Sequence, residues 1–121
     1  YAVCAWRNRQ AGGEVIPQAV IERAPSAELR ENQTDQDSLP PYALLDAILK
    51  ASIDHERAPE EIIAELTPQW PDHDVAHETA RMLRLVRISE WKRRQAAPGP
   101  KLSRRAFGRE RRYPITSGYG G

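Results

Sequence analysis

The sequence predicts a predominantly α-helical chain, and three observations lead to that prediction. Apolar residues recur at helical spacing in several stretches, and no stretch shows the alternation typical of a β-strand. Prolines stand where helices are expected to begin, and glycine or proline residues stand where they end. The length of 121 residues, with 40% hydrophobic and 29% charged residues, suits one small soluble domain with a modest core.

Residues 1–25 are predicted to be a helical start. Residues 1–8 resemble the end of an amphipathic helix that the glycine pair at 12–13 stops. Residues 17–23 form a short predicted helix with Pro17 near its first turn. Because the chain opens inside a helical pattern, without Met or a signal-peptide pattern, we expect it to be a fragment of a longer protein.

Residues 26–40 have no periodicity and are rich in acidic and amide side chains, so we predict a loop. Loops of this length tend to be functional or disordered.

Three further helices are predicted within residues 41–97. The first runs from the proline pair at 40–41 to about residue 55, the second starts at residue 59, and the third, capped by Asp72 or Asp74, runs to about residue 95. Their predicted buried residues are Leu45, Ile48, Leu49 and Ser52 or Ile53 in the first, Ile62, Ile63 and Leu66 in the second, and Val75, Thr79, Met82, Leu83 and Val86 in the third.

The charges are strongly separated along the chain, although the formal net charge is only +1. Residues 28–74 hold twelve acidic and three basic residues, a net charge of −9. Residues 91–121 hold nine basic residues and one acidic residue, a net charge of +8. We predict that residues 98–121 are a basic, extended tail. Two such blocks can attract each other, or either can meet a charged ligand or partner.

Several classes of protein are excluded by composition. The single Cys4 rules out an internal disulfide and a cysteine-rich zinc site, and it favours a reducing, cytoplasmic setting. No apolar run approaches the roughly 20 residues of a membrane helix. His73 and His77 have helical zinc spacing, but two histidines on a solvated face are far commoner than a metal site. We therefore predict no metal ligand in this chain.

Three stretches carry a resemblance to a known family. They are "APSAEL" at 24–29, residues 35–42 followed by "LLDAIL", and "SEWKRRQAAPGPKLSRRAFGRERRYPIT" at 89–116. In this order and spacing they resemble the C-terminal part of the NAD synthetase family in its glutamine-dependent bacterial form. The short, ammonia-dependent form is similar only in "APSAEL" and "EWKRR", because it lacks the "AFGRERRYPIT" segment.

The resemblance implies an amide-forming ligase with an α/β synthetase domain of the Rossmann-like, adenine nucleotide alpha hydrolase type. This chain would be its C-terminal helical part. The family activates the nicotinate carboxylate of deamido-NAD with ATP and Mg²⁺, and glutamine-derived ammonia then displaces AMP. The SGGxDS-type ATP loop, the Mg²⁺ ligands and the amidase domain are expected upstream, so this chain alone should be inactive. A homo-oligomer is also implied.

The same resemblance suggests binding residues but no catalytic residue in this chain. It implies that Lys92 and Trp91 contact deamido-NAD and that Ser26 contacts ATP from the loop. Glu28 in the loop and Arg93 near the tail are expected to support them. The simpler interpretations are a solvated lysine near a helix end, a ring that anchors the helix, and a serine that ends or caps a helix.

The alternative function is a helical nucleic-acid-binding module. Its basic tail, with Phe107, Tyr113 and Tyr119 interspersed, would follow a phosphate backbone and stack on bases. The acidic middle of the chain argues against this function, because it would repel nucleic acid, and no known nucleic-acid-binding motif is present. A third reading is a purely structural helical interaction module.

Overall fold

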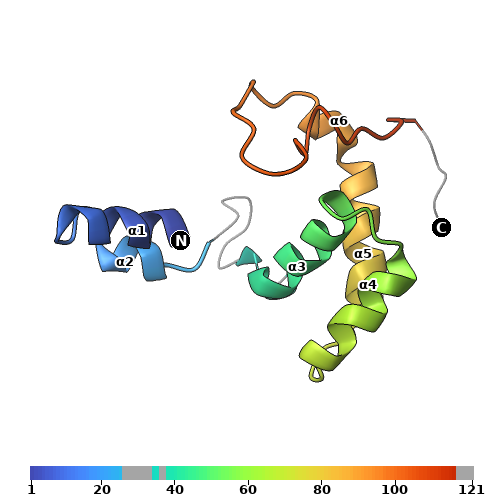
Figure 1. Cartoon of the computed structure of the whole chain (residues 1–121), viewed down its shortest axis with the longest axis horizontal. Coiled ribbons are helices and arrows are strands. Elements are labelled where there is room, and N and C mark those ends of the chain that lie inside the picture. Colours follow the sequence, from blue (N-terminus) through green and yellow to red (C-terminus); the bar gives the residue numbers. More distant parts are fainter. Residues whose placement is uncertain (26–33, 36–37, 117–121) are drawn as a thin grey trace. The chain divides into compact units, whose positions relative to one another are not determined.

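The computed structural model describes residues 1–25, 34–35 and 38–116. Within these ranges the regular elements are helices and no strand element occurs, which confirms the predominantly α-helical prediction (Figure 1). None of these helices is long and apolar enough to cross a membrane. The chain separates into two compact units, Tyr1–Leu39 and Pro40–Gly121.

The first unit contains two short helices, α1 (Ala2–Ala11) and α2 (Gln18–Glu22). Gly12 ends α1 with a φ of 66°, in the left-handed region that favours glycine, so the predicted glycine stop is confirmed. Pro17 precedes the first residue of α2. Neither helix contains a buried residue.

Asn8 of α1 holds the connection between these two helices. Its Oδ1 accepts hydrogen bonds from the backbone N–H groups of Val15 at 3.0 Å and Ile16 at 2.8 Å, and its Nδ2 donates to the carbonyl oxygen of Ile16 at 2.9 Å. One side chain thereby satisfies three backbone groups of a segment without regular structure.

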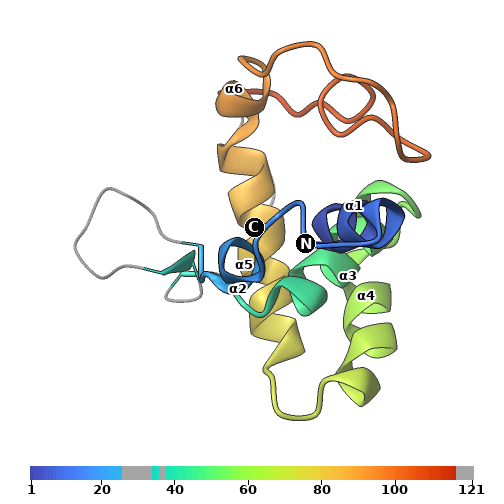
Figure 2. The ribbon, with the colours of Figure 1, turned by 90° about the vertical axis from the view of Figure 1, so that its left-hand side faces the viewer.

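The second unit is built around three helices that each pack on the other two (Figures 1 and 2). They are α3 (Tyr42–Ile53), α4 (Pro59–Leu66) and α5 (Val75–Ile88), and the 3-10 turn η2 (Thr67–Gln69) follows α4. Their buried apolar residues form the core: Leu44, Ile48, Ala51, Ile53, Ile62, Leu66, Val75, Met82 and Val86.

The predicted buried faces of α4 and α5 are confirmed except at Ile63 and Leu83, which are only half-buried. The predicted face of α3 was partly wrong. Leu44 and Ala51 are buried, whereas Leu45 and Leu49 are only half-buried. Apolar residues stand on nearly every side of α3, so their spacing alone does not define one face. Because α3 packs against both α4 and α5, the packing decides which side is buried.

Side-chain caps start two of the helices. The Asp74 carboxylate accepts a hydrogen bond from the His77 N–H at 3.0 Å, so Asp74 rather than Asp72 caps α5. At the start of α4, the Glu61 carboxylate accepts a hydrogen bond from the Ala58 N–H at 2.8 Å.

The third helix was predicted to continue to about residue 95, and this prediction was wrong. Helix α5 ends at Ile88, and the separate one-turn helix α6 (Glu90–Arg93) follows Ser89. Ser89 has φ −91° and ψ 7°, and its hydroxyl donates to the carbonyl oxygen of Leu85 at 2.7 Å. A serine hydroxyl that bonds back to the preceding turn bends or interrupts a helix.

The predicted extended tail is also corrected within residues 98–116, which we call the basic loop. The loop turns back on itself beside α6, to the left of this helix in Figure 1 and to its right in Figure 2. Glu110 closes the turn, because its N–H donates to the carbonyl oxygen of Ala106 at 3.0 Å and its carboxylate lies 2.7 Å from the Lys101 ammonium.

Candidate functional site

Helix α6 exposes the two residues predicted to contact deamido-NAD. Trp91 is 47% exposed, and Lys92 also lies at the surface. The Lys92 ammonium lies 5.5 Å from the centroid of the Trp91 ring, within cation–π range. An exposed ammonium beside an exposed ring offers a point charge and a flat apolar surface to one ligand.

Arg93 packs against the basic loop and is only 15% exposed. Its guanidinium lies 4.9 Å from the centroid of Phe107 and 6.0 Å from that of Tyr113. Its Nη1 donates to the Ser89 hydroxyl at 2.8 Å. Among the described residues, no partner accepts a hydrogen bond from its buried Nε. The supporting role predicted for Arg93 stays a prediction.

Glu90 is the most deeply buried charged residue of this region, and the sequence analysis did not single it out. Its carboxylate is 1% exposed and lies 2.7 Å from Arg93 Nη2 and 2.9 Å from Arg94 Nε. Burial raises the pKa of Glu90, but hydrogen bonds from Arg94, Arg93 and the Tyr113 backbone outweigh burial and lower this pKa below its ordinary value. The sequence did contain a signal for these ion pairs, because Arg93 and Arg94 follow Glu90 by three and four residues, the spacing of neighbours on a helix.

Tyr113 of the basic loop is held by both of its backbone polar groups. Its N–H hydrogen-bonds Glu90, and its carbonyl oxygen accepts a hydrogen bond from Arg94 Nη2 at 2.8 Å. Its hydroxyl accepts from Arg111 Nε at 3.2 Å. The ion pair of α6 therefore fixes the returning end of the loop.

Glu56 ties the other side of the loop to the end of α3. Its carboxylate lies 2.6 Å from Arg105 Nη2 and 3.5 Å from Arg111 Nη1. Glu56 has a φ of 53°, a left-handed conformation that is uncommon for a residue other than glycine. The attraction between the acidic and basic segments thus has a specific contact here.

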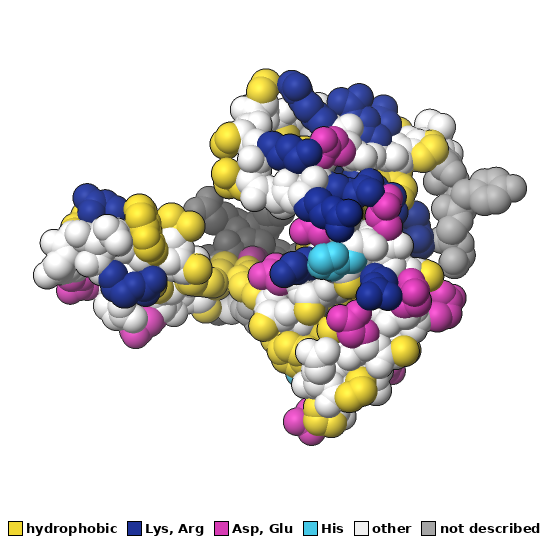
Figure 3. All heavy atoms as spheres, in the orientation of Figure 1, with side chains coloured by type: hydrophobic (Ala, Val, Ile, Leu, Met, Phe, Trp, Pro, Cys, Tyr) yellow, Lys and Arg dark blue, Asp and Glu magenta, His cyan; other side chains and the backbone are white. Residues whose placement is uncertain are grey.

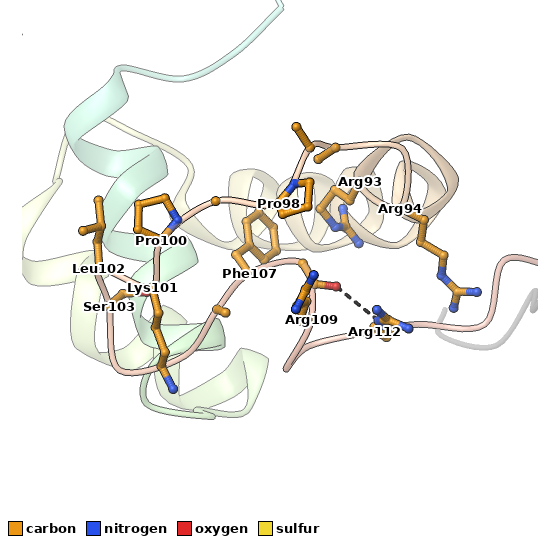
Figure 4. Close-up of a pocket in the computed structure, with 15 residues that line it drawn as sticks. Arg93, Arg94, Pro98, Pro100, Lys101, Leu102, Ser103, Phe107, Arg109 and Arg112 are labelled. Atoms are coloured by element: carbon orange, nitrogen blue, oxygen red, sulfur yellow. Dashed lines mark hydrogen bonds between the residues drawn. The ribbon is translucent and has the colours of Figure 1, made fainter.

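The basic loop and α6 surround a pocket of about 610 Å³. Among the described residues that line it, the cations are Arg93, Arg94, Lys101, Arg109 and Arg112, and none is a carboxylate. Figure 4 shows Arg93 at the end of α6 and Arg94 directly after it, with Arg109 and Arg112 in the returning part of the loop.

The wall of this pocket also contains Pro98, Pro100, Leu102 and Phe107. Lysine and arginine side chains gather around α6 and the loop in Figure 3. Such a surface suits a ligand that combines an anionic group with an apolar part.

Two predicted site residues, Ser26 and Glu28, lie outside the described residues. In the part of the chain that the structure describes, no group of three or more His, Cys, Asp or Glu side chains gathers as metal ligands do. His73 packs edge-on against Trp70, with ring centroids 5.6 Å apart.

Comparison with known proteins gives consistent matches. The model of the family described as NAD synthase matches residues 1–96. The glutamine-dependent NAD(+) synthetase of Xanthomonas campestris pv. campestris (strain 8004) is 59% identical over the whole chain, and that of Thermotoga maritima is 42% identical over 97% of it. The chain spans only 21% and 19% of these two relatives, respectively.

A solved structure is similar as well. The glutamine-dependent NAD+ synthetase of Acinetobacter baumannii in complex with ADP has a TM-score of 0.58 and 38% sequence identity, over 98% of this chain and 19% of the solved chain. These relatives give no support to the nucleic-acid-binding alternative.

Proposed function

Because the chain belongs to the NAD synthase family, we propose that it is the C-terminal helical part of a glutamine-dependent NAD synthetase. The intact enzyme would activate the nicotinate carboxylate of deamido-NAD as an adenylate with ATP, and ammonia from glutamine would displace AMP to give the amide. Whole-chain similarity to synthetases of this name supports the proposal.

The remaining parts of this enzyme are proposed to lie outside the chain. They are the parallel sheet of a Rossmann-like synthetase domain, its ATP loop and an amidase domain. We also propose that the intact enzyme is cytoplasmic and forms a homo-oligomer. Sedimentation of the purified protein would test the oligomeric state. The chain alone should form no NAD from deamido-NAD, ATP and ammonia.

The contribution that we assign to this chain is the contact made by Lys92 and Trp91. A lysine ammonium is a compact point charge suited to a phosphate or carboxylate oxygen, and an indole ring offers a stacking surface. The exposure of both side chains on α6 supports this role. The cationic pocket that α6 and the basic loop line adds positive potential that would attract a dinucleotide.

Magnesium is expected with ATP, where it would neutralise phosphate charge. The described residues offer no cluster of carboxylates suited to hold it. The Mg²⁺ ligands are therefore proposed to lie elsewhere in the enzyme.

The test is Lys92→Ala in the full-length enzyme. Hydrogen bonds to charged groups contribute about 1.5–3 kcal/mol, so the apparent KM for deamido-NAD should rise by about one to two orders of magnitude. Glutaminase activity assayed alone should change far less. Lys92→Arg should restore the KM only partly, since a planar fork does not replace an ammonium.

Lys50→Ala is the matched control, because Lys50 is also exposed near a helix end but lies on α3. It should leave the deamido-NAD kinetics unchanged. Unchanged kinetics in Lys92→Ala would remove the site assignment.

A further inference from the structure

Helix α6 is too short to hold its own direction. It contains one turn, and an isolated turn of helix is unstable in water because its nucleation cost is not recovered. Ser89 also separates it from the regular hydrogen bonding of α5. The direction in which Trp91 and Lys92 leave the protein must therefore be set by contacts of α6 with other segments.

Contacts within α6 and its cap explain only part of this order. The Arg93 guanidinium bonds the Ser89 hydroxyl at 2.8 Å and Glu90 at 2.7 Å. The bond to Glu90 lies within one turn and would move with α6 if it tilted. The bond to Ser89 links α6 to the end of α5, because the Ser89 hydroxyl donates to the Leu85 carbonyl oxygen. These contacts fix the shape of α6 and its junction with α5, but none of them reaches the basic loop.

The contact with Tyr113 reaches a segment far away in the sequence. Glu90 accepts from the Tyr113 N–H, and Arg94 donates to the Tyr113 carbonyl oxygen at 2.8 Å. Glu90 also orients Arg94, because its carboxylate lies 2.9 Å from Arg94 Nε. The ion pair therefore binds both polar groups of one backbone residue, as a neighbouring β-strand would.

The sequence favours the backbone conformation of Tyr113 that this contact requires. Pro114 follows it, and a residue before proline is biased toward an extended conformation. An extended residue presents its N–H and C=O on the same side, where one Glu–Arg pair can reach both. Residues Glu90 and Lys92 are two positions apart and do not face each other on a helix. Glu90 can therefore hold α6 from one side while Lys92 stays exposed on another.

We propose that Glu90 is a positioning residue for the dinucleotide contact. Through Arg94 and the backbone of Tyr113 it fixes α6, and with it the direction in which Trp91 and Lys92 meet deamido-NAD. This inference rests on the proposed function and adds to it a buried carboxylate that touches no substrate.

The experiment compares variants of the full-length enzyme. Glu90→Gln should raise the KM for deamido-NAD by about one order of magnitude, since a misplacement of roughly 1 Å is enough for effects of this size or larger. The KM for ATP and the separate glutaminase activity should remain near wild type. Hydrogen exchange at Tyr113 should become faster, because its N–H loses a charged acceptor. Glu90→Asp keeps the charge and should restore the KM in part.

Two further variants serve as a replacement for Glu90→Gln and as a control. If Glu90→Gln does not fold, Arg94→Lys removes the bond to the Tyr113 carbonyl but keeps a cation beside Glu90, and it should raise the KM in the same direction. Glu78→Gln is the matched control, because Glu78 pairs with Arg81 at 2.9 Å with the same spacing as Glu90 and Arg93. It should leave the deamido-NAD kinetics and the exchange at Tyr113 unchanged.

The outcomes separate this inference from the proposed function. A wild-type KM in both Glu90→Gln and Arg94→Lys, with a raised KM in Lys92→Ala, would overturn the positioning role alone. A wild-type KM in Lys92→Ala would overturn the proposed contact, and the positioning role would fall with it.

Discussion

The helical core and the basic loop of the second unit are held together by different forces. Helices α3, α4 and α5 bury apolar residues such as Leu44, Ile48 and Ile62 completely. The basic loop exposes most of its large apolar residues, with Leu102 at 91%. It is held instead by ion pairs, backbone hydrogen bonds and arginines stacked on rings. Apolar burial does not depend on ionised groups and is not weakened by screening, whereas exposed ion pairs weaken both in salt and in acid.

Because different forces hold them, the core and the basic loop can be destabilised separately. The core supports the site by holding the ends of α3 and α5 in place. The loop determines where α6 points. A change that loosens the loop alone should alter ligand contact while the core remains folded, and the following experiments test that separation.

The largest effect on stability is expected from Ile48→Ala in the core. Ile48 is 0% exposed, and truncation of a buried isoleucine costs about 2–5 kcal/mol because it leaves a cavity. Hydrogen exchange throughout α3, α4 and α5 should accelerate accordingly. Leu102→Ala in the loop should change stability by less than about 0.5 kcal/mol, as is usual at exposed positions. Equal effects of the two substitutions would contradict the distinction between core and loop.

The next largest effect is expected from acid. The folded-state pKa of Glu90 is lowered, so its contribution to stability is complete above the unfolded value of about 4.3 and is lost as pH falls through the lower folded value. Each hydrogen bond to the charged carboxylate contributes about 1.5–3 kcal/mol.

Exchange at Tyr113, corrected for its intrinsic pH dependence, should therefore accelerate below about pH 4 while the core remains protected. The pKa of Glu110 is also lowered, mainly by its hydrogen bond with Lys101, so its protonation at low pH should also loosen the loop. In Glu90→Gln the acid response at Tyr113 should be reduced. A response of equal size in that variant would assign the effect to other groups.

A smaller effect is expected from Asp74→Ala at the start of α5. The lost cap should cost about 1 kcal/mol. Exchange should accelerate in the first turn of α5, near His77, and not in the basic loop. Asp74→Ser should restore most of the protection, since serine is also a good N-cap. Faster exchange in the loop would show that the two regions are coupled through α5.

The smallest effect is expected from Glu56→Gln. Glu56 and its arginine partners are partly exposed, and such pairs contribute about 0–1 kcal/mol. The substitution should slightly accelerate exchange near Arg105. Salt at 1 M, where the Debye length is about 3 Å, should reproduce that change in the wild type and add little in the variant. An additive salt effect would indicate that other pairs dominate.

The helices of the core could be predicted from the sequence because their signals are local. Pro59 with Glu60 and Glu61 marks the start of α4, and Asp74 marks the start of α5. The amphipathic stripe of α5 then identifies most of its buried residues. The face of α3 was less predictable, because two neighbouring helices compete for its many apolar residues.

The candidate site could be predicted only in part. The motif led to Lys92, Trp91 and Arg93, but their binding roles stay predictions. The importance of Glu90 depends on Tyr113, and the Arg94 bond to Tyr113 spans 19 positions, so no local pattern reveals it. The break at Ser89 was missed because serine is tolerated inside helices, and its effect depends on how its hydroxyl bonds the carbonyl oxygens of Leu85 and Val86.

The absence of buried residues in α1 and α2 has a consequence for handling the polypeptide. Val3, Trp6, Val15 and Val20 are all exposed in this structure. The isolated polypeptide, with these side chains uncovered, would tend to aggregate in solution. Yield and shelf life of the 121-residue polypeptide should therefore be limited by its first unit, even where the helical core is fully folded.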